Sequence, residues 1–258
     1  MCGDTIRHHG MCHYGECHYG ECQPASEQQI IQYPAENEEP DICNEEAMTL
    51  GTGHRSSKPS LNIILLGESG SGKSASGNTI LGWKAFTSEP SSKPVTTECK
   101  MMKKRIRRTR VKIIDTPYFF DDTLKEKSTD ILRCRELCRE GSLCVYLLVI
   151  QIGRFTEGER DILERLEKAL QTTVRDRAII LFTRGDDLKE GSIDSYLKNT
   201  NADLQELTKH CGNRYQVMNN TDQSAAAGQA KELLEKIAKL ILDLDKARVF
   251  NGNSCIIA

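Results

Sequence analysis

Three features are absent from the sequence, and each absence argues against a class of protein. No run of 18 apolar residues occurs among its 258 residues, so no segment predicts a helix that spans a bilayer. The first ten residues contain no apolar core of the signal-peptide kind, and we therefore expect a protein without a secretion signal. The net charge is only −2, from 35 Lys and Arg against 37 Asp and Glu, which argues against a protein that coats nucleic acid.

Cysteine, by contrast, is abundant. The chain has 11 cysteines, an odd number, and no secretion signal accompanies them. This combination favours free thiols in the cytoplasm over a disulfide framework. With 38% hydrophobic and 28% charged residues, the composition is ordinary enough to build a core, which excludes disorder of the whole chain.

Composition divides the chain into three parts. Residues 1–58 carry ten acidic and three basic residues without helical or strand periodicity, and predict a disordered tail. Residues 59–247 predict the folded domain, and 248–258 a flexible C-terminal tail. The first tail contains a CHYGE-CHYGE-C repeat, which is either a soft-metal site or a repeat expansion without function. The ligands of that metal site are Cys12, His13, Cys17, His18 and Cys22.

Within 59–247, short runs of branched apolar residues alternate with helix-like segments. The strand-like runs are 61–66, 109–116, 142–150, 177–183 and 215–218, and the helix-like segments lie near 73–81, 123–140, 157–171, 193–210 and 222–245. The last of these repeats apolar residues at i, i+3, i+4 and i+7, as a helix packed on a sheet does. The alternation predicts an α/β fold, a mostly parallel twisted sheet with helices on both faces, whose ligands bind at the carboxyl ends of the strands.

The strongest motif follows the first strand-like run. Residues 67–74, GESGSGKS, satisfy the P-loop pattern G-x4-G-K-[ST] between a predicted strand and a predicted helix. Successive backbone N–H groups of such a loop point at phosphate oxygens, its lysine reaches the β- and γ-phosphates, and its serine hydroxyl binds Mg²⁺. The predicted phosphate-binding residues are Gly67, Glu68, Ser69, Gly70, Ser71, Gly72, Lys73, Ser74 and Ala75.

Three later stretches, each at the end of a predicted strand, favour GTP and GDP over adenine nucleotides. Asp115 stands where a P-loop protein places the acid that holds the water shell of Mg²⁺. Thr183, Arg184 and Asp186 stand where guanine-specific proteins place a base-reading element, whose carboxylate accepts from the N1–H and N2–H₂ groups of guanine. Asn219 and Asn220 follow the last strand, in the loop expected to complete the base pocket.

The stretches ESGSGKSASGNTILG, PVTTEC, IIDTP, CVYLLVIQIGRFTEGER, ILFTRGDDL and CGNRYQVMNN resemble the GTPases of immunity-associated proteins (the GIMAP family, with an AIG1-type G domain) over about residues 60–245. The resemblance implies a guanine-nucleotide-binding domain that dimerises or oligomerises when loaded with GTP. It also implies that Thr96 completes the Mg²⁺ site with Ser74 and, through water, Asp115; Thr97 is the rival assignment. Such proteins lack a catalytic glutamine of the Ras kind, and no glutamine follows Asp115 here.

Two residues bear on hydrolysis rather than on nucleotide binding. The family motif reads Asp-Thr-Pro-Gly, and this chain has Tyr118 in place of the glycine. A bulky residue there either strains the loop and weakens γ-phosphate sensing, or is tolerated by a small shift. Arg154, in the family-specific box, is the candidate catalytic residue, acting in trans as an arginine finger across a dimer. The alternative is a structural Arg154 that pairs with Glu157 or Glu159.

Two features concern membranes. Residues 100–112 hold eight basic residues and predict a charged edge hairpin, which serves either to block strand pairing or to contact anionic lipid. The chain ends Cys-Ile-Ile-Ala, a C-a-a-X sequence that predicts farnesylation of Cys255. A single prenyl chain binds membranes weakly, so we expect a cytoplasmic protein partly attached to the cytosolic face of a membrane.

The resulting hypothesis is an oligomerising guanine-nucleotide-binding protein with slow or dimer-stimulated GTP hydrolysis, tethered by a prenyl group. A hydrolysis-deficient GTP/GDP-binding scaffold is the first alternative, and a P-loop ATPase or small-molecule kinase is the second. The predicted partners are guanine nucleotide with Mg²⁺, a second G domain met through the nucleotide face, and a membrane, but no nucleic acid.

Overall fold

The computed structural model describes residues 60–252, apart from 92, 107–108, 121–126, 139–142 and 189–190. These residues belong to a single compact unit within His54–Ala258. The predicted N-terminal tail with its CHYGE repeat, and the predicted lipidation site Cys255, lie outside the described residues.

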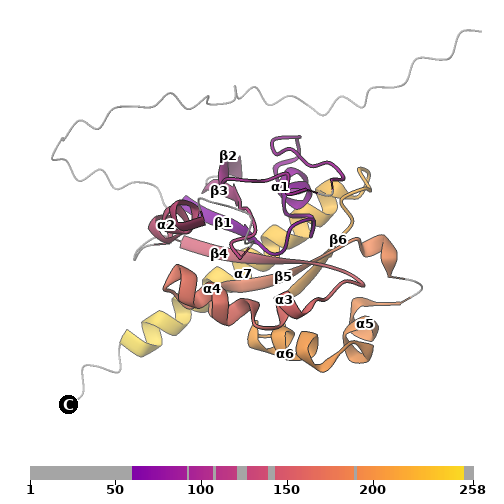
Figure 1. Cartoon of the computed structure of the whole chain (residues 1–258). Coiled ribbons are helices and arrows are strands. Elements are labelled where there is room, and N and C mark those ends of the chain that lie inside the picture. The colour runs from indigo at the N-terminus through magenta and orange to yellow at the C-terminus, as the bar shows by residue number, and fades with distance from the viewer. Residues whose placement is uncertain are drawn as a thin grey trace, which may run out of the picture. The chain divides into compact units, whose positions relative to one another are not determined.

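The domain is built on one six-stranded sheet with the strand order β2-β3-β1-β4-β5-β6 (Figure 1). Only the β2–β3 pair is antiparallel, and every other neighbouring pair is parallel. The strands are β1 (Ser60–Leu66), β2 (Lys100–Ile106), β3 (Thr109–Asp115), β4 (Leu143–Gln151), β5 (Ala178–Thr183) and β6 (Tyr215–Met218). The predicted mostly parallel sheet is therefore confirmed.

Helices follow most strands and cover the sheet. They are α1 (Lys73–Leu81), α2 (Lys127–Leu137), α3 (Glu157–Arg160), α4 (Ile162–Leu170), α5 (Ile193–Asn199), α6 (Ala202–His210) and α7 (Ala226–Gly252), with short 3-10 turns at Arg175–Arg177 and Gly185–Asp187. In the part of the chain that the structure describes, none of these helices combines the length and the apolar character that crossing a bilayer requires.

Two predicted helices are each broken into two. The segment 157–171 is interrupted at Asp161, which ends α3 and precedes α4. The segment 193–210 is interrupted at Asn201, whose side chain accepts a hydrogen bond from the Leu204 backbone N–H at 2.9 Å and so starts α6. Asparagine is a preferred N-cap because its side chain satisfies a backbone donor of the first turn. The predicted single helices were therefore wrong at these two points.

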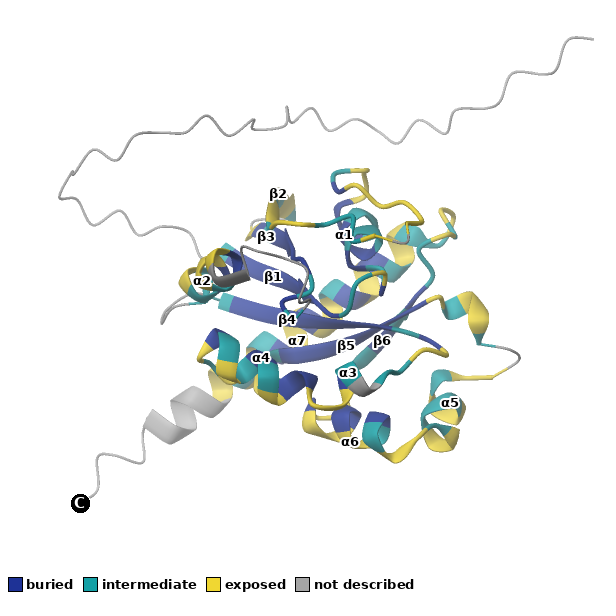
Figure 2. Ribbon diagram, viewed as in Figure 1, coloured by how far each residue is buried: buried dark blue, intermediate teal, exposed yellow. Residues whose placement is uncertain are grey.

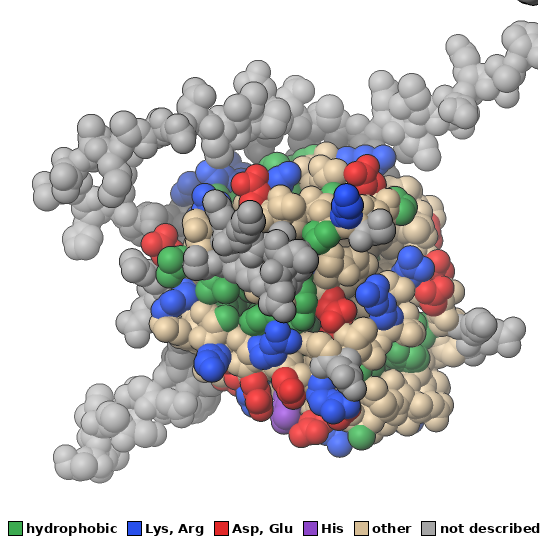
Figure 3. Space-filling view, in the orientation of Figure 1, with side chains coloured by type: hydrophobic (Ala, Val, Ile, Leu, Met, Phe, Trp, Pro, Cys, Tyr) green, Lys and Arg blue, Asp and Glu red, His purple; other side chains and the backbone are tan. Residues whose placement is uncertain are grey.

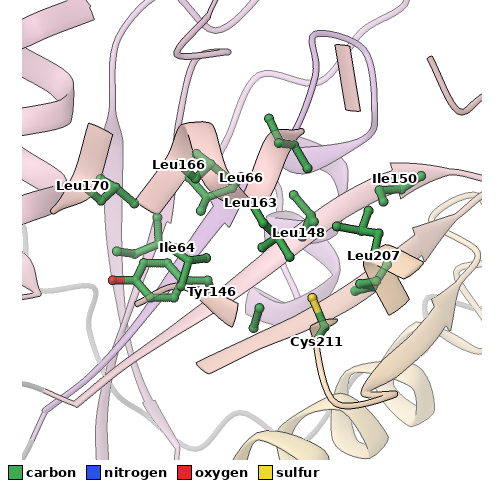
Figure 4. Close-up of a cluster of buried hydrophobic side chains, with 14 of the residues drawn as sticks. Ile64, Leu66, Tyr146, Leu148, Ile150, Leu163, Leu166, Leu170, Leu207 and Cys211 are labelled. Carbon is green, nitrogen blue, oxygen red and sulfur yellow. The ribbon is translucent and has the colours of Figure 1, made fainter. Parts of the chain in front are cut away.

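Two apolar clusters lie on opposite faces of the sheet, as the dark strands between paler helices in Figure 2 illustrate. One joins the sheet to α2, α4 and α6, and includes Tyr146, Leu148 and Leu166 (Figure 4). The other joins it to α1 and α7, where Leu233 and Ile237 are fully buried, as the apolar periodicity of the last helix predicted. Parallel strands that are covered on both faces require such continuous apolar runs.

The predicted basic hairpin is the β2–β3 pair, and β2 forms one edge of the sheet. Lys100, Lys103 and Arg105 are exposed along β2, whereas Lys104 turns inward, donates to the Leu81 carbonyl at 2.6 Å and lies over the ring of Trp83. Exposed lysines on an edge strand oppose pairing with another sheet. On the face seen in Figure 3, acidic and basic side chains are interspersed.

Candidate nucleotide-binding site

The loop between β1 and α1 lies at the carboxyl end of the central strand, and two glycines shape it. Gly67 has φ 143°, and a Cβ added there would collide with the Val149 backbone oxygen of the neighbouring strand β4. Gly72 has φ 99° and caps α1. Both are backbone conformations that favour glycine, so the loop keeps this tight course only with glycine at these positions.

Lys73 is buried beneath this loop. Its ammonium donates to the backbone oxygens of Gly67 at 3.0 Å and Glu68 at 2.7 Å. Burial lowers the pKa of Lys73 to about 8, although the charges of Asp115 and Glu68 act in the opposite direction. No side chain caps the start of α1, so the backbone N–H groups of its first turn, in Lys73, Ser74 and Ala75, face the loop without a side-chain acceptor. A buried cation beside uncapped N–H groups is an arrangement that binds phosphate.

Three oxygen-bearing side chains meet next to Lys73. The Ser74 hydroxyl donates to Asp115 Oδ2 at 2.7 Å and lies 3.1 Å from Thr96 Oγ1, which itself donates to Asp115 Oδ2 at 3.3 Å. The second carboxylate oxygen, Asp115 Oδ1, is buried without a partner among the described residues. Thr97 is exposed, so of the two rival threonines the structure brings Thr96 to the site. Hard oxygen donors with one unsatisfied carboxylate oxygen fit Mg²⁺.

Burial raises the pKa of Asp115, and the hydrogen bond from Ser74 and the charge of Lys73 oppose that shift. A divalent cation at this point adds positive charge next to a desolvated carboxylate, which favours its ionised form. The site therefore suits a complex in which the negative charge of the carboxylate is offset by the positive charges of Lys73 and a magnesium ion.

The predicted base-reading element lies at the carboxyl end of β5 and is tied to the P-loop. The Thr183 hydroxyl donates to the Ser71 backbone oxygen at 2.7 Å, and both residues are buried. Arg184, with φ 57°, begins a short turn that leaves Asp186 exposed to solvent at the rim. Gly185 packs close to Val217 and to the backbone of Asn219, so this turn adjoins the loop after β6.

The two asparagines of that loop have partners of their own. The Asn219 side chain accepts from Thr221 in a local turn. The Asn220 side chain bridges to α1, donating to Ser76 Oγ at 3.0 Å and accepting from Thr79 Oγ1 at 2.9 Å. The structure thus places the loop after β6 beside the Gly185 turn, and the Asn220 side chain anchors it to α1. The Asn219 backbone is held by Gln229, whose side chain accepts from the Asn219 N–H at 2.6 Å and donates to its carbonyl at 3.2 Å.

The sequence did not predict a contact between the P-loop and the residue that caps α3. The Thr156 hydroxyl donates to Glu68 Oε1 at 2.7 Å, and the Thr156 backbone N–H donates to Glu159 Oε2 at 3.0 Å. The Thr-x-x-Glu spacing is a capping-box pattern and signals the helix start from sequence. Nothing in the sequence joins that helix start to Glu68, which lies 88 positions away along the chain.

Tyr118 and Arg154 lie on the same side of the site. Tyr118 is not among the described residues with positive φ, so the backbone strain considered for this position is absent from this conformation. Its ring packs edge-on against Phe120, and burial raises the pKa of its hydroxyl. Arg154 is exposed and lines a small surface depression with Glu68, Ser69 and Ser71. Among the described side chains Arg154 makes no ion pair with Glu159, to which it is attracted only at longer range. The side chain of Glu157, the other partner considered for Arg154, lies outside the described residues.

Burial raises the pKa of Glu159 to about 7, and the nearby charge of Glu68 adds to the shift. Folding therefore binds a proton at Glu159 between about pH 4.5 and 7, so the stability contribution of this group falls as the pH rises through that window and is constant above it. In the wild type we expect this titration to lower the free energy of unfolding by about 2–4 kcal/mol across the window. Glu159→Gln keeps an acceptor for Thr156 and should not show this fall.

The measurement is urea unfolding at several pH values between 5 and 8 for the wild type, Glu159→Gln and the exposed Glu164→Gln as control. The wild type and the control should lose stability with rising pH relative to Glu159→Gln. Parallel curves for all three proteins would show that Glu159 does not titrate in this range.

Comparison with known proteins identifies the family. The model of the AIG1 family matches residues 61–252. GTPase IMAP family member 8 of Mus musculus is 40% identical over 171 residues, which covers 64% of this chain and 25% of that protein. Immune-associated nucleotide-binding protein 12 of Arabidopsis thaliana is 34% identical over 194 residues, covering 71% of this chain and 49% of that protein. The chain thus spans between a quarter and a half of these relatives.

Solved structures share the fold. A dimerisation-deficient mutant of Toc33 from Arabidopsis thaliana has a TM-score of 0.55 at 14% identity, over 71% of this chain and 85% of that one. Toc33 in complex with Mg²⁺ and GMPPNP has a TM-score of 0.53 at 15% identity, over 72% and 86%. Because the AIG1 family model covers nearly all of the described residues, this chain belongs to the AIG1 family and carries its GTP-binding G domain.

Proposed function

We propose that this protein oligomerises through its nucleotide face when GTP is bound, and that it hydrolyses GTP slowly alone and faster in the oligomer. The observation that carries the proposal is the convergence of Lys73, Ser74, Thr96 and Asp115 beside an uncapped helix start. When bound, Mg²⁺ supplies charge to the phosphates, held by Ser74 and Thr96 and through water by Asp115. Lys73 holds the β- and γ-phosphates, and Asp186 selects guanine.

Arg154 supports catalysis in trans. It is exposed at the rim of the phosphate loop, where it lines a depression with Ser69 and Glu68. An exposed arginine at this rim can reach the nucleotide of a facing copy and neutralise charge in the transition state. Dimerisation is also reported as important for the GTPase activity of two fold relatives, Toc33 and Toc159.

The test is single-turnover GTP hydrolysis at increasing protein concentration, with the oligomeric state measured in the same samples. The rate constant should rise with concentration, and Arg154→Ala should lower the plateau by about 10³-fold, since arginine fingers contribute about 10³ to 10⁵. The matched control is Arg110→Ala, an exposed arginine near the start of β3, at the opposite end of the sheet from the P-loop. It should leave the plateau unchanged.

A hydrolysis-deficient scaffold is the second candidate. It is favoured by the absence of a glutamine directly after Asp115 and by the half-buried Tyr118 in the place of the motif glycine. Tight GTP binding without hydrolysis at any protein concentration would support this scaffold and overturn catalysis in trans. Preference for ATP over GTP in competition binding would overturn both.

We further propose that a farnesyl thioether on Cys255 attaches the protein to the cytosolic face of a membrane. The support is the terminal Cys-Ile-Ile-Ala sequence. Cys255→Ser is expected to move the protein from the membrane to the soluble fraction of eukaryotic cells, whereas Cys43→Ser, a second cysteine outside the described domain, should not. Mass spectrometry of the C-terminal peptide decides the matter, because an intact, unmodified end on a soluble protein contradicts the proposal.

A further inference from the structure

Two cysteines meet between the loop that carries Thr96 and the helix α2. Cys99 follows Thr96 by three residues and directly precedes β2, and Cys134 lies in α2. Their sulfur atoms are 3.9 Å apart, and both thiols are free. Cys134 is fully buried, whereas Cys99 is partly exposed. A reagent from solution therefore reaches Cys99 first.

A second, independent contact holds this pair together. The Cys99 backbone N–H donates to Asp130 Oδ1 at 3.0 Å, and Asp130 lies one helical turn before Cys134 in α2. Asp130 is itself buried. The two thiols are therefore neighbours because the backbone of the Thr96 loop is bound to α2, and not only because two flexible side chains happen to point at one another.

Other uses of these sulfur atoms fit less well. Two more cysteines, Cys138 and Cys144, lie close by, but within the described ranges no three cysteine, histidine or acidic side chains gather as a metal site requires. Cys144 donates to the Leu137 backbone oxygen at 3.1 Å, as a packed structural thiol does. The pair formed by Cys99 and Cys134 joins the loop that carries Thr96 to α2.

We propose that Cys99 and Cys134 form a disulfide when the protein meets a hydroperoxide, and that this bond fixes the Thr96 loop in its closed position. The first part concerns the thiols alone. The second part rests on the proposed function, since it concerns the retention of guanine nucleotide.

The chemistry balances with hydrogen peroxide as the oxidant. The Cys99 thiolate attacks the O–O bond, which breaks to give a sulfenic acid and hydroxide. The Cys134 thiol then attacks the sulfenic sulfur, the S–O bond breaks, and water leaves as the S–S bond forms. In sum, two thiols lose two electrons and two protons, and one peroxide becomes two waters.

The surroundings of Cys99 also determine the rate of disulfide formation. Hydrogen bonding with Cys134 and burial both raise the pKa of Cys99, so little reactive thiolate is present at neutral pH. The bond should therefore form slowly and only in an excess of oxidant. A disulfide requires sulfur atoms about 2.05 Å apart, so the sulfurs must approach by about 2 Å, which side-chain rotation in a partly exposed loop allows.

The consequence for the site follows from this conformation. Thr96 already lies within hydrogen-bond distance of Ser74 and Asp115 while Cys99 lies against Cys134. Tying Cys99 to α2 limits how far Thr96, three residues away, can move from the magnesium site. In the proposed complex Thr96 contributes to the magnesium site that holds the nucleotide, so the oxidised protein should release nucleotide more slowly.

The experiment uses the full chain, incubated with hydrogen peroxide, alkylated and digested without reductant. Mass spectrometry should detect the peptide of Cys99 joined to that of Cys134 in the wild type and in Cys138→Ala, but not in Cys99→Ala or Cys134→Ala. The absence of this linked peptide, or a Cys138–Cys144 link in its place, would overturn the disulfide. The wild-type digest decides this even if a variant fails to fold.

The release of a fluorescent GDP analogue from the same samples tests the closed loop. Oxidation should slow release at least about fivefold in the wild type and in Cys138→Ala, dithiothreitol should restore it, and Cys134→Ala should not respond. Unchanged release from protein that carries the link would overturn the fixing of the loop. If no guanine nucleotide binds at all, the proposed function fails, and the linked peptide still decides whether the disulfide forms.

Discussion

Lys73→Ala is expected to weaken the binding of both GDP and GTP by at least about 100-fold. The Lys73 ammonium lies buried under the loop with its donors directed at loop carbonyls, ready to transfer to phosphate oxygens. Each charge-assisted hydrogen bond contributes about 1.5–3 kcal/mol. Losing two of them corresponds to about two to four decades in affinity.

The measurement is a titration with fluorescent GDP and GTP analogues in the presence of Mg²⁺. Lys84→Ala removes an exposed lysine just after α1 and should leave both affinities unchanged. Circular dichroism tests whether Lys73→Ala is folded and so separates lost binding from lost folding. We expect this variant to fold, because burial disfavours the charged form of Lys73 and the charge therefore contributes little to the stability of the empty protein. Tight magnesium-dependent binding by a folded Lys73→Ala protein would mean that this loop does not hold phosphate.

Asp186→Asn is expected to exchange guanine for xanthine preference. In the proposed complex the Asp186 carboxylate would accept from two donors of guanine. An amide replaces one acceptor oxygen by a donor, which suits the extra oxygen of xanthine. Each of the two bonds to a charged acceptor contributes about 1.5–3 kcal/mol, so the affinity for GTP should fall by about 100-fold or more while that for XTP rises.

The matched control is Asp187→Asn, which alters the adjacent exposed carboxylate in the same short turn. It should retain GTP affinity and gain none for XTP, as competition binding against both nucleotides would show. If Asp186→Asn behaves like Asp187→Asn, Asp186 does not read the base and the guanine assignment of this turn fails.

The sequence predicted those parts of the molecule that depend on local pattern. The P-loop at 67–74 has its own spacing, the edge hairpin has its basic alternation, and the apolar face of α7 repeats with helical period, so each was placed before the structure was known. The breaks at Asp161 and Asn201 were missed because apolar periodicity continues across them. At Asn201 a single capping side chain, rather than a change of pattern, divides the helices, whereas Asp161 separates α3 from α4 without a side-chain cap.

The contacts between distant segments were beyond the sequence. Glu68 meets Thr156 because the parallel strands β1 and β4 bring the loops at their ends together. Cys99 meets Cys134 because α2 packs against the sheet beside the start of β2. Asn220 illustrates the same limit in the opposite direction. Its position after the last strand predicted a base contact, whereas its side chain bridges to Ser76 and Thr79 on α1. Position along the chain identified the loop, but the packing decided the direction of the side chain.

The central place of β1 has a consequence for the order of events during synthesis. Ile64 pairs with Ile114 on one side and Tyr146 on the other, both in strands made much later, so β1 leaves the ribosome without either partner. Gly67 fits against Val149, and Ser71 against Thr183, which are made later still. Pairing over such distances is slow because a long loop must close first. A nascent chain that carries the whole phosphate-binding sequence therefore acquires its shape only after β5 has emerged, and guanine nucleotide can stabilise this protein only in the last stage of its folding.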